Sequence, residues 1–90
     1  MELESKIQSR IIGYLRANGY FVTKLSVTST TGIPDVLAIK DGKALFVEVK
    51  RKGNKPSELQ LYRIKELQSY GAECIVAYSI EDLVKIVNKP

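Results

Sequence analysis

The chain has 90 residues, of which 44% are hydrophobic and 27% charged, with a net charge of +4 and an isoelectric point near 9.3. This length and composition predict a single globular domain over residues 1–90 and exclude a disordered chain and a membrane span. The sequence contains no histidine and one cysteine, Cys74, which argues against a zinc site or a disulfide framework and fits a reducing cytoplasm. No secretory signal is visible. The mild basicity permits a nucleic-acid partner without requiring one.

The first half of the chain predicts a helix followed by three strands. In chain order, we expect these elements over residues 3–18, 20–27, 35–40 and 43–51. The polar stretch 28–34 is expected to be a loop. Asp41-Gly42, between the last two strands, is the preferred pair for a two-residue hairpin turn.

The second half predicts a helix, a strand and a last helix. Ser57 and Gln60 have the spacing of a capping box, so a helix is expected to begin at Ser57 and to end at Gly71. A short apolar strand over residues 74–78 follows. A last helix through Val87 is expected to be capped by Ser79, with Asp82 three residues on. The order α-β-β-β-α-β-α predicts an α/β fold, a mixed sheet with the hairpin at its centre, helices on its faces and parallel pairing of the last two strands.

The hairpin turn places two acidic residues opposite each other. A two-residue turn at Asp41-Gly42 sets Asp35 directly across from Glu48, with their Cβ atoms roughly 4.5–5.5 Å apart. Strand alternation places Lys50 on the same face as both carboxylates. Like charges placed directly opposite are destabilising, so this arrangement needs an explanation.

Three explanations are open at this point. The charged residues could form a solvated polar face, or they could form a structural ion-pair cluster. The third explanation is a metal site, in which two carboxylates, a backbone carbonyl and waters hold Mg²⁺ or Mn²⁺. We favour the metal site because both strands are rich in apolar residues, and a buried carboxylate without a partner is costly. A lysine on this face would orient a water or stabilise a developing negative charge.

These residues carry a resemblance to a known family. Pro34-Asp35, followed by Glu48-Val49-Lys50 on the next strand, resembles the P-D…(D/E)-x-K signature of the restriction-endonuclease-like nucleases, whose αβββαβ core has the same element order. More narrowly, the chain is similar to the stand-alone VRR-type nuclease (VRR-NUC) domains of phages and bacteria. That similarity covers nearly the whole chain, and its motifs are Glu4, Gly32-Ile33-Pro34-Asp35, Phe46-Val47-Glu48-Val49-Lys50 and Ser57-x-x-Gln60.

The resemblance implies hydrolysis of DNA phosphodiester bonds by an endonuclease that depends on Mg²⁺ or Mn²⁺. The implied roles are metal ligation by Asp35, Glu48 and the Val49 carbonyl, catalysis by Lys50, and an accessory acid near the metal at Glu4, with Glu2 as a weaker candidate. Gln60 would position the lysine, a water or the phosphate. Glu4 could instead be a first-turn acid favoured by the helix dipole, and Gln60 could serve the capping box alone.

The expected partner is DNA. The candidate phosphate contacts are Lys24, Arg51, Lys52, Lys55 and Arg63, with Lys6 and Arg10 as weaker candidates, although lysines in a loop often serve solubility. Similar stand-alone domains act on four-way (Holliday) junctions as homodimers, which implies branched DNA, a homodimer and, for a phage protein, the host cytoplasm. The alternatives are a DNA-binding module without activity and a nuclease subunit that needs a partner protein.

Overall fold

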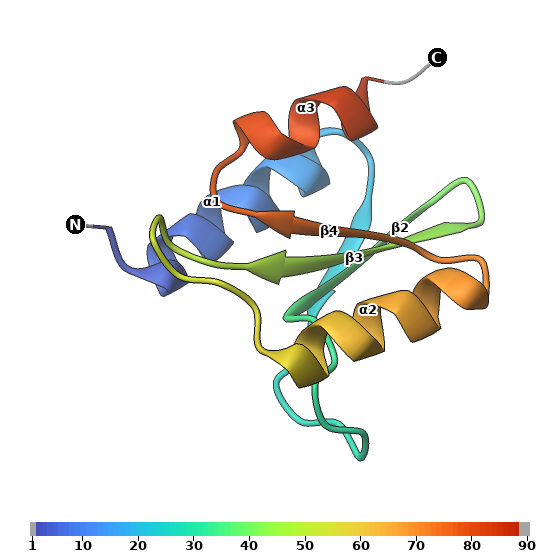
Figure 1. The fold of residues 1–90 in the computed structure, drawn as a ribbon. Coiled ribbons are helices and arrows are strands. Elements are labelled where there is room, and N and C mark those ends of the chain that lie inside the picture. The colour runs from blue at the N-terminus through green and yellow to red at the C-terminus, as the bar shows by residue number, and fades with distance from the viewer. Residues whose placement is uncertain (1, 89–90) are drawn as a thin grey trace.

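The computed structural model describes residues 2–88, which form a mixed four-stranded sheet with three helices (Figure 1). In chain order the elements are α1 (Glu4–Ala17), β1 (Phe21–Lys24), β2 (Val36–Lys40), β3 (Lys43–Val49), α2 (Glu58–Ser69), β4 (Glu73–Ala77) and α3 (Glu81–Val87). This order confirms the α/β architecture predicted from the sequence. Within residues 2–88, no helix has the length and apolar character needed to cross a membrane.

The strands are arranged in their chain order, β1-β2-β3-β4, with β2 and β3 at the centre. The β1–β2 and β2–β3 pairs are antiparallel, and β3 pairs with β4 in parallel, as the crossover through α2 predicts. Lys40 is opposite Lys43, and Asp41 and Gly42 between them have positive φ angles of 53° and 76°. Both angles fit a type I′ turn, so the predicted hairpin register is confirmed.

The helices cover both faces of the sheet. Figure 1 shows α1 and α3 on one face and α2 on the other. The larger apolar core lies under α1 and α3, where the buried side chains are Ile7, Ile11, Ile12, Leu15, Val22, Val36, Ala38, Leu45, Val47, Val49, Ala77 and Leu83. On the opposite face α2 contributes the buried Ile64. This explains why both central strands are apolar on both faces.

Two strands are shorter than the sequence predicts. β1 ends at Lys24 rather than at residue 27, because its partner strand β2 begins at Val36, opposite Lys24. One further hydrogen bond, from the Leu25 N–H to the Asp35 carbonyl (2.8 Å), follows this last pair. β3 ends at Val49 rather than at residue 51. The Lys50 N–H still donates to the carbonyl of Ala77 (3.0 Å), which is the last residue of β4. Both strands therefore stop where their neighbours stop.

The predicted cap of the last helix is wrong. The N-cap residue of α3 is Ile80, and its side chain makes no capping hydrogen bond. The Asp82 carboxylate instead accepts a hydrogen bond from the backbone N–H of Tyr78 (2.7 Å). Tyr78 follows the last residue of β4, so Asp82 satisfies a donor that the sheet no longer pairs.

The loop that precedes β2 is packed closely against α2. Gly32 has φ +81°, and a Cβ at this position would lie 2.9 Å from Leu59 Cγ and 3.1 Å from the Leu59 carbonyl oxygen. A side chain at residue 32 would therefore be strained by its backbone angle and would also collide with the first turn of α2.

We expect Gly32→Ala to lower the free energy of unfolding by more than about 1 kcal/mol, because it adds both backbone strain and a clash. Gly13→Ala is the matched control, since a Cβ there meets nothing within 4 Å and the residue lies inside α1. The control should raise stability by roughly 0.5–1 kcal/mol, the helix preference of alanine over glycine. Urea denaturation of both variants measures the two shifts, and a neutral Gly32→Ala would contradict the close packing.

Candidate active site

Asp35 is held at the start of β2 by its neighbours on both sides. The preceding Pro34 is buried, and the Asp35 carbonyl pairs with Leu25 at the end of β1. The backbone N–H of Val49 donates to Asp35 Oδ2 (2.8 Å). This bond ties the carboxylate to the end of β3, beside Glu48. Continuing the register from the Val36–Val47 pair places Asp35 opposite Glu48, as predicted.

Glu48 is a buried carboxylate, with an exposed fraction of 2%. Its Oε2 accepts a hydrogen bond from Gln60 Nε2 (3.2 Å) and lies 3.8 Å from Lys50 Nζ. Its Oε1 is buried and has no hydrogen-bond partner among residues 2–88. Of the three explanations for the acidic pair, a solvated polar face is excluded, since this carboxylate is removed from water.

The electrostatics of the site favour a protonated Glu48. Burial, followed by the negative charge of Asp35, raises the pKa of the Glu48 carboxyl from 4.5 to about 8. The positive charge of Lys50 acts in the opposite direction, while the negative charge of Glu4 adds to the rise in pKa. A buried acid with an unpaired oxygen is costly to stability, which is typical of a functional site rather than of a structural ion pair.

Gln60 connects the site to the start of α2. Its Oε1 accepts from the Ser57 N–H (2.8 Å), and its backbone N–H donates to Ser57 Oγ (3.1 Å), so the predicted capping box is confirmed. The Nε2 of the same side chain donates to Glu48. The structural and the functional interpretations of Gln60 are therefore compatible, because one amide makes both contacts.

Glu4 lies at the loop that follows β3. Its Oε2 accepts hydrogen bonds from the Asn54 side-chain amide (3.2 Å) and, at a longer distance, from the Arg51 N–H (3.4 Å). The Glu2 carboxylate instead pairs with Arg10 on α1. Of the two candidate accessory acids, Glu4 is the one whose charge raises the pKa of Glu48. Within the described residues, no three His, Cys, Asp or Glu side chains gather into a group able to hold a metal, so a cation would also need oxygen from the backbone and from water.

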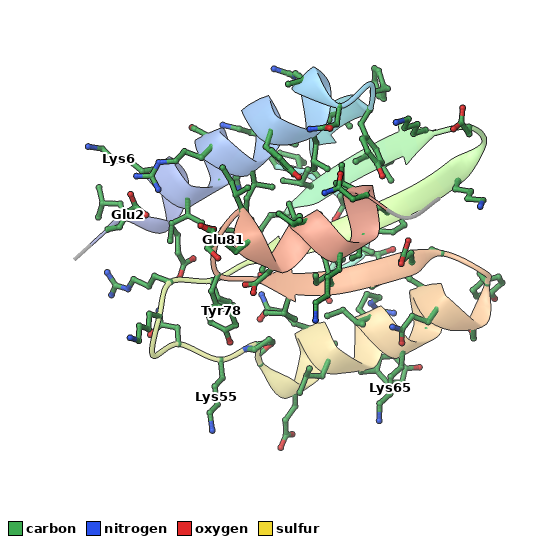
Figure 2. The ribbon with its side chains drawn as sticks, turned by 90° about the horizontal axis from the view of Figure 1, so that it is seen from above. Glu2, Lys6, Lys55, Lys65, Tyr78 and Glu81 are labelled. Atoms are coloured by element: carbon green, nitrogen blue, oxygen red, sulfur yellow. The ribbon has the colours of Figure 1, made fainter. Side chains whose placement is uncertain are left out.

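Three of the predicted DNA contacts belong to one segment. Arg51, Lys52 and Lys55 lie in residues 50–56, which we call the basic loop, and Lys52 and Lys55 are exposed. Figure 2 shows Lys55 projecting away from the body of the domain. Because the loop continues directly from β3, it begins at Lys50, beside the two acids.

The other two predicted contacts are placed differently. Lys24 pairs opposite Val36, so it lies on the α1 face of the sheet, and it lines a cavity of about 360 Å³ there. Arg63 is engaged within the protein. Its Nε donates to the Thr31 carbonyl (2.9 Å) and its Nη1 to Glu66 (2.7 Å). Arg63 thereby ties the loop before Asp35 to α2, a role that its position in the sequence does not reveal.

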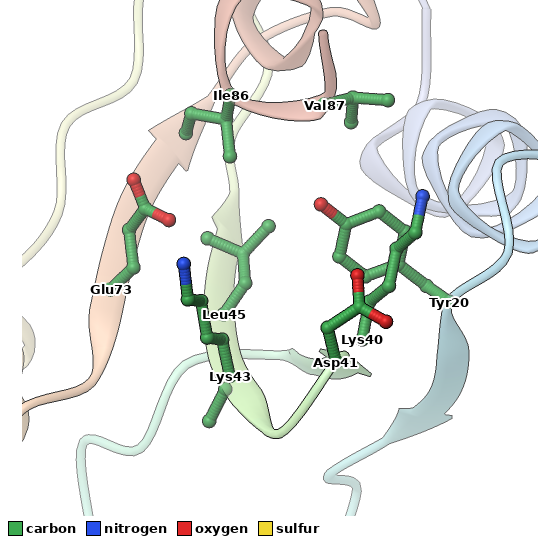
Figure 3. A pocket seen from close by; sticks show the side chains of 9 residues that line it. Tyr20, Lys40, Asp41, Lys43, Leu45, Glu73, Ile86 and Val87 are labelled. Atoms are coloured by element: carbon green, nitrogen blue, oxygen red, sulfur yellow. The ribbon is translucent and has the colours of Figure 1, made fainter. Parts of the chain in front are cut away.

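Another cavity, of about 260 Å³, lies at the turn end of the hairpin (Figure 3). It is lined by Tyr20, Lys40, Lys43 and neighbouring residues, and it contains none of the predicted site residues. Lys40 Nζ donates to the Asn18 carbonyl (2.8 Å) and lies 5.4 Å from the centre of the Tyr20 ring, so this lysine already has partners. The acidic pair occupies the opposite, open end of the hairpin.

Comparison with known proteins agrees with this fold, although no family model matches the chain. A protein named "Putative nuclease p44", from Acyrthosiphon pisum secondary endosymbiont phage 1, is 33% identical over 85 residues, which cover 93% of this chain and 90% of that protein. A solved structure described as "VRR_NUC domain" has a TM-score of 0.81 and 31% identity, over 93% of this chain and 92% of that one.

A second solved structure, described as "VRR_NUC domain protein", has a TM-score of 0.74 over 96% of this chain and 85% of that one. At 18% identity it supports the fold alone. The curated relative and the first solved structure define a small α/β nuclease domain. More particularly, the chain belongs to the VRR-type nuclease (VRR-NUC) family, which confirms the resemblance found in its sequence.

The raised pKa of Glu48 predicts how stability depends on pH in the presence of EDTA. Between about pH 4.5 and 8 the folded protein keeps the proton of Glu48, whereas the unfolded chain loses it. Stability should therefore fall as the pH rises through this window and level off above it. The expected loss is on the order of a few kcal/mol, since each tenfold change in an ionisation constant corresponds to about 1.4 kcal/mol.

Urea denaturation across this pH range, compared with Glu48→Gln, measures the effect. The glutamine variant should lose the slope, because it does not ionise. Glu58→Gln, at an exposed position in the first turn of α2, is the control and should keep the slope. Equal slopes in the wild type and in Glu48→Gln would show that Glu48 titrates normally.

Proposed function

We propose that the protein is an endonuclease that depends on Mg²⁺ or Mn²⁺ and hydrolyses DNA phosphodiester bonds, with a preference for branched DNA. The observation that carries this proposal is the buried Glu48, whose Oε1 is unpaired and whose neighbour across the hairpin is a second carboxylate, Asp35. Such a pair is unfavourable by itself and suits a hard divalent cation, which prefers oxygen ligands.

The residues present fit such a cation. Asp35, Glu48 and the Val49 carbonyl would hold it, and Glu4 would act as an accessory acid through water. When bound, the cation would lower the pKa of a nearby water and neutralise the negative charge that develops on the phosphate. Its charge would also favour the ionised form of Glu48, which burial and Asp35 disfavour.

In the proposed reaction a water attacks phosphorus directly, and the chain's own side chains would orient the reacting groups. Lys50 shares the face of the two acids, and its ammonium group is 3.8 Å from Glu48. From there it would donate to the attacking water or to a phosphate oxygen and stabilise the developing negative charge. Gln60 fixes the carboxylate of Glu48 through Oε2. The loop contact made by Arg63 helps to fix the segment that leads into Asp35.

We propose DNA as the substrate because of the small size of the domain and the positive charge of the basic loop beside the site. Arg51, Lys52 and Lys55 would contact phosphates, which gives affinity without reading the base sequence. Lys24 and Arg63 are weaker candidates, since one lies on the α1 face and the other has two protein partners. A domain of this size offers little surface for reading sequence, so selectivity for DNA structure is favoured. A two-fold homodimer would suit two symmetric nicks in a four-way junction in the host cytoplasm.

The decisive experiment is a cleavage assay with the purified protein. Labelled four-way junction, flap and linear duplex are each incubated with Mg²⁺, Mn²⁺ or EDTA. We expect paired nicks in the junction with either metal and none in EDTA. Lys50→Ala should lower the cleavage rate by at least about 100-fold, the usual cost of losing one preorganised charge-stabilising donor.

The control is Lys65→Ala, which removes an exposed lysine from α2 and should cut like the wild type. Equal cutting of all three substrates would keep the nuclease and remove the preference for branched DNA. Binding without any cutting would contradict the proposed activity and would favour an inert module or a missing partner subunit.

The salt dependence of DNA binding tests the basic loop. In EDTA, Lys52→Ala should reduce the slope of log Kd against log salt concentration by about one, the signature of one lost phosphate contact. Lys65→Ala is again the control, since Figure 2 shows Lys65 on α2 and apart from the basic loop. Fluorescence anisotropy over about 50–200 mM salt measures both slopes. An unchanged slope for Lys52→Ala would place the DNA elsewhere on the surface.

A further inference from the structure

A tyrosine hydroxyl attaches Asn54, in the middle of the basic loop, to the exit of β4. Tyr78 follows the last residue of β4, and its hydroxyl donates a hydrogen bond to the carbonyl of Asn54 (3.0 Å). Figure 2 shows the Tyr78 ring beside the loop that carries Lys55. The two residues are 24 positions apart in the sequence. The contact therefore joins the exit of β4 to the loop that follows the proposed catalytic strand.

Tyr78 is itself fixed at its backbone. Its N–H donates to Asp82 Oδ2 (2.7 Å) in the first turn of α3. The residue before it, Ala77, accepts the hydrogen bond from the Lys50 N–H. The backbone that carries the Tyr78 ring is therefore held by a hydrogen bond to α3 and, one residue earlier, by a hydrogen bond from the proposed catalytic lysine.

A second attachment joins the basic loop to the first residue of α1. Glu4 accepts from the Asn54 side-chain amide and from the Arg51 N–H, while the Asn54 N–H donates to the Arg51 carbonyl (3.0 Å). Asn54 is therefore the point where the two attachments meet, one through its carbonyl and the other through its side chain. Gly53, next to it, has φ +95°, so this turn depends on a residue with wide conformational freedom.

We propose that Tyr78 is a positioning residue that holds the basic loop in the conformation that binds DNA; this rests on the proposed function of the site. A loop that is already ordered does not lose its conformational freedom when it binds, so affinity is higher than for the same charges on a mobile loop. The chemistry at Asp35, Glu48 and Lys50 does not involve the hydroxyl. Its loss should therefore weaken binding more than it slows the cleavage step.

Tyr78→Phe tests this proposal, because it deletes one oxygen atom and keeps the ring. Tyr70→Phe is the matched control, since Tyr70 is 86% exposed and its hydroxyl makes no hydrogen bond within residues 2–88. Three quantities are compared: amide hydrogen exchange of residues 51–55 without DNA, the Kd for the four-way junction in EDTA, and the single-turnover cleavage rate at saturating protein.

For Tyr78→Phe we expect exchange at Arg51 and Asn54 to accelerate by about three- to tenfold and the Kd to rise by a similar factor, the range expected for one lost hydrogen bond. The cleavage rate at saturation should change by less than about twofold, because the reacting groups keep their places. Tyr70→Phe should match the wild type in all three measurements. Faster exchange with an unchanged Kd, or unchanged exchange, would overturn the proposal.

A fall in the saturated cleavage rate without a change in Kd would also overturn the proposal, since it would place Tyr78 in the chemical step. A wild-type protein that binds no DNA would overturn the proposed function and, with it, the loop's role in binding. The exchange measurement would still decide whether the hydroxyl holds the loop, so the two failures can be distinguished.

Discussion

The opposition of Asp35 and Glu48 at the open end of the β2–β3 hairpin is the constraint on which the rest of the site depends. The type I′ turn at Asp41-Gly42 sets it, because a slip of one residue would move Glu48 to the other face of the sheet. Helices on both faces then remove that carboxylate from water. The arrangement raises the pKa of Glu48, so the fold carries an electrostatic cost at the place where the proposed chemistry occurs.

The two faces of the sheet carry different kinds of side chain. The face under α1 and α3 carries most of the buried apolar side chains, among them Val36 and Val47, the pair next to Asp35 and Glu48. The face under α2 carries the acids and Lys50. Neighbouring residues of a strand alternate between the faces, so Glu48 lies between the core residues Val47 and Val49, while Asp35 directly precedes the core residue Val36. The position of the carboxylates is thus fixed by the packing of the opposite face.

The features that sequence could predict are those set by short-range rules. The hairpin register, the capping box of α2 and the parallel crossover each follow from residues a few positions apart or from the element order. The contacts of Glu4 with Arg51, of Arg63 with Thr31 and of Tyr78 with Asn54 join residues 47, 32 and 24 positions apart, so no local pattern indicates them. The cap predicted at Ser79 failed for the same reason, since Asp82 is engaged by the exit of β4 rather than by its own helix.

These long-range contacts hold the loops beside the site, which the small core of the domain does not hold by apolar packing. A chain of 90 residues has a small core, and the loops beside the site contribute few buried side chains to it. Polar contacts therefore hold these loops, with Arg63 on the segment before Asp35, and Glu4 and Tyr78 on the basic loop. A partly exposed hydrogen bond of this kind contributes little to global stability, yet it decides how far a loop moves. Substitutions at these residues should therefore separate DNA binding and catalysis from folding, whereas substitutions in the core cannot.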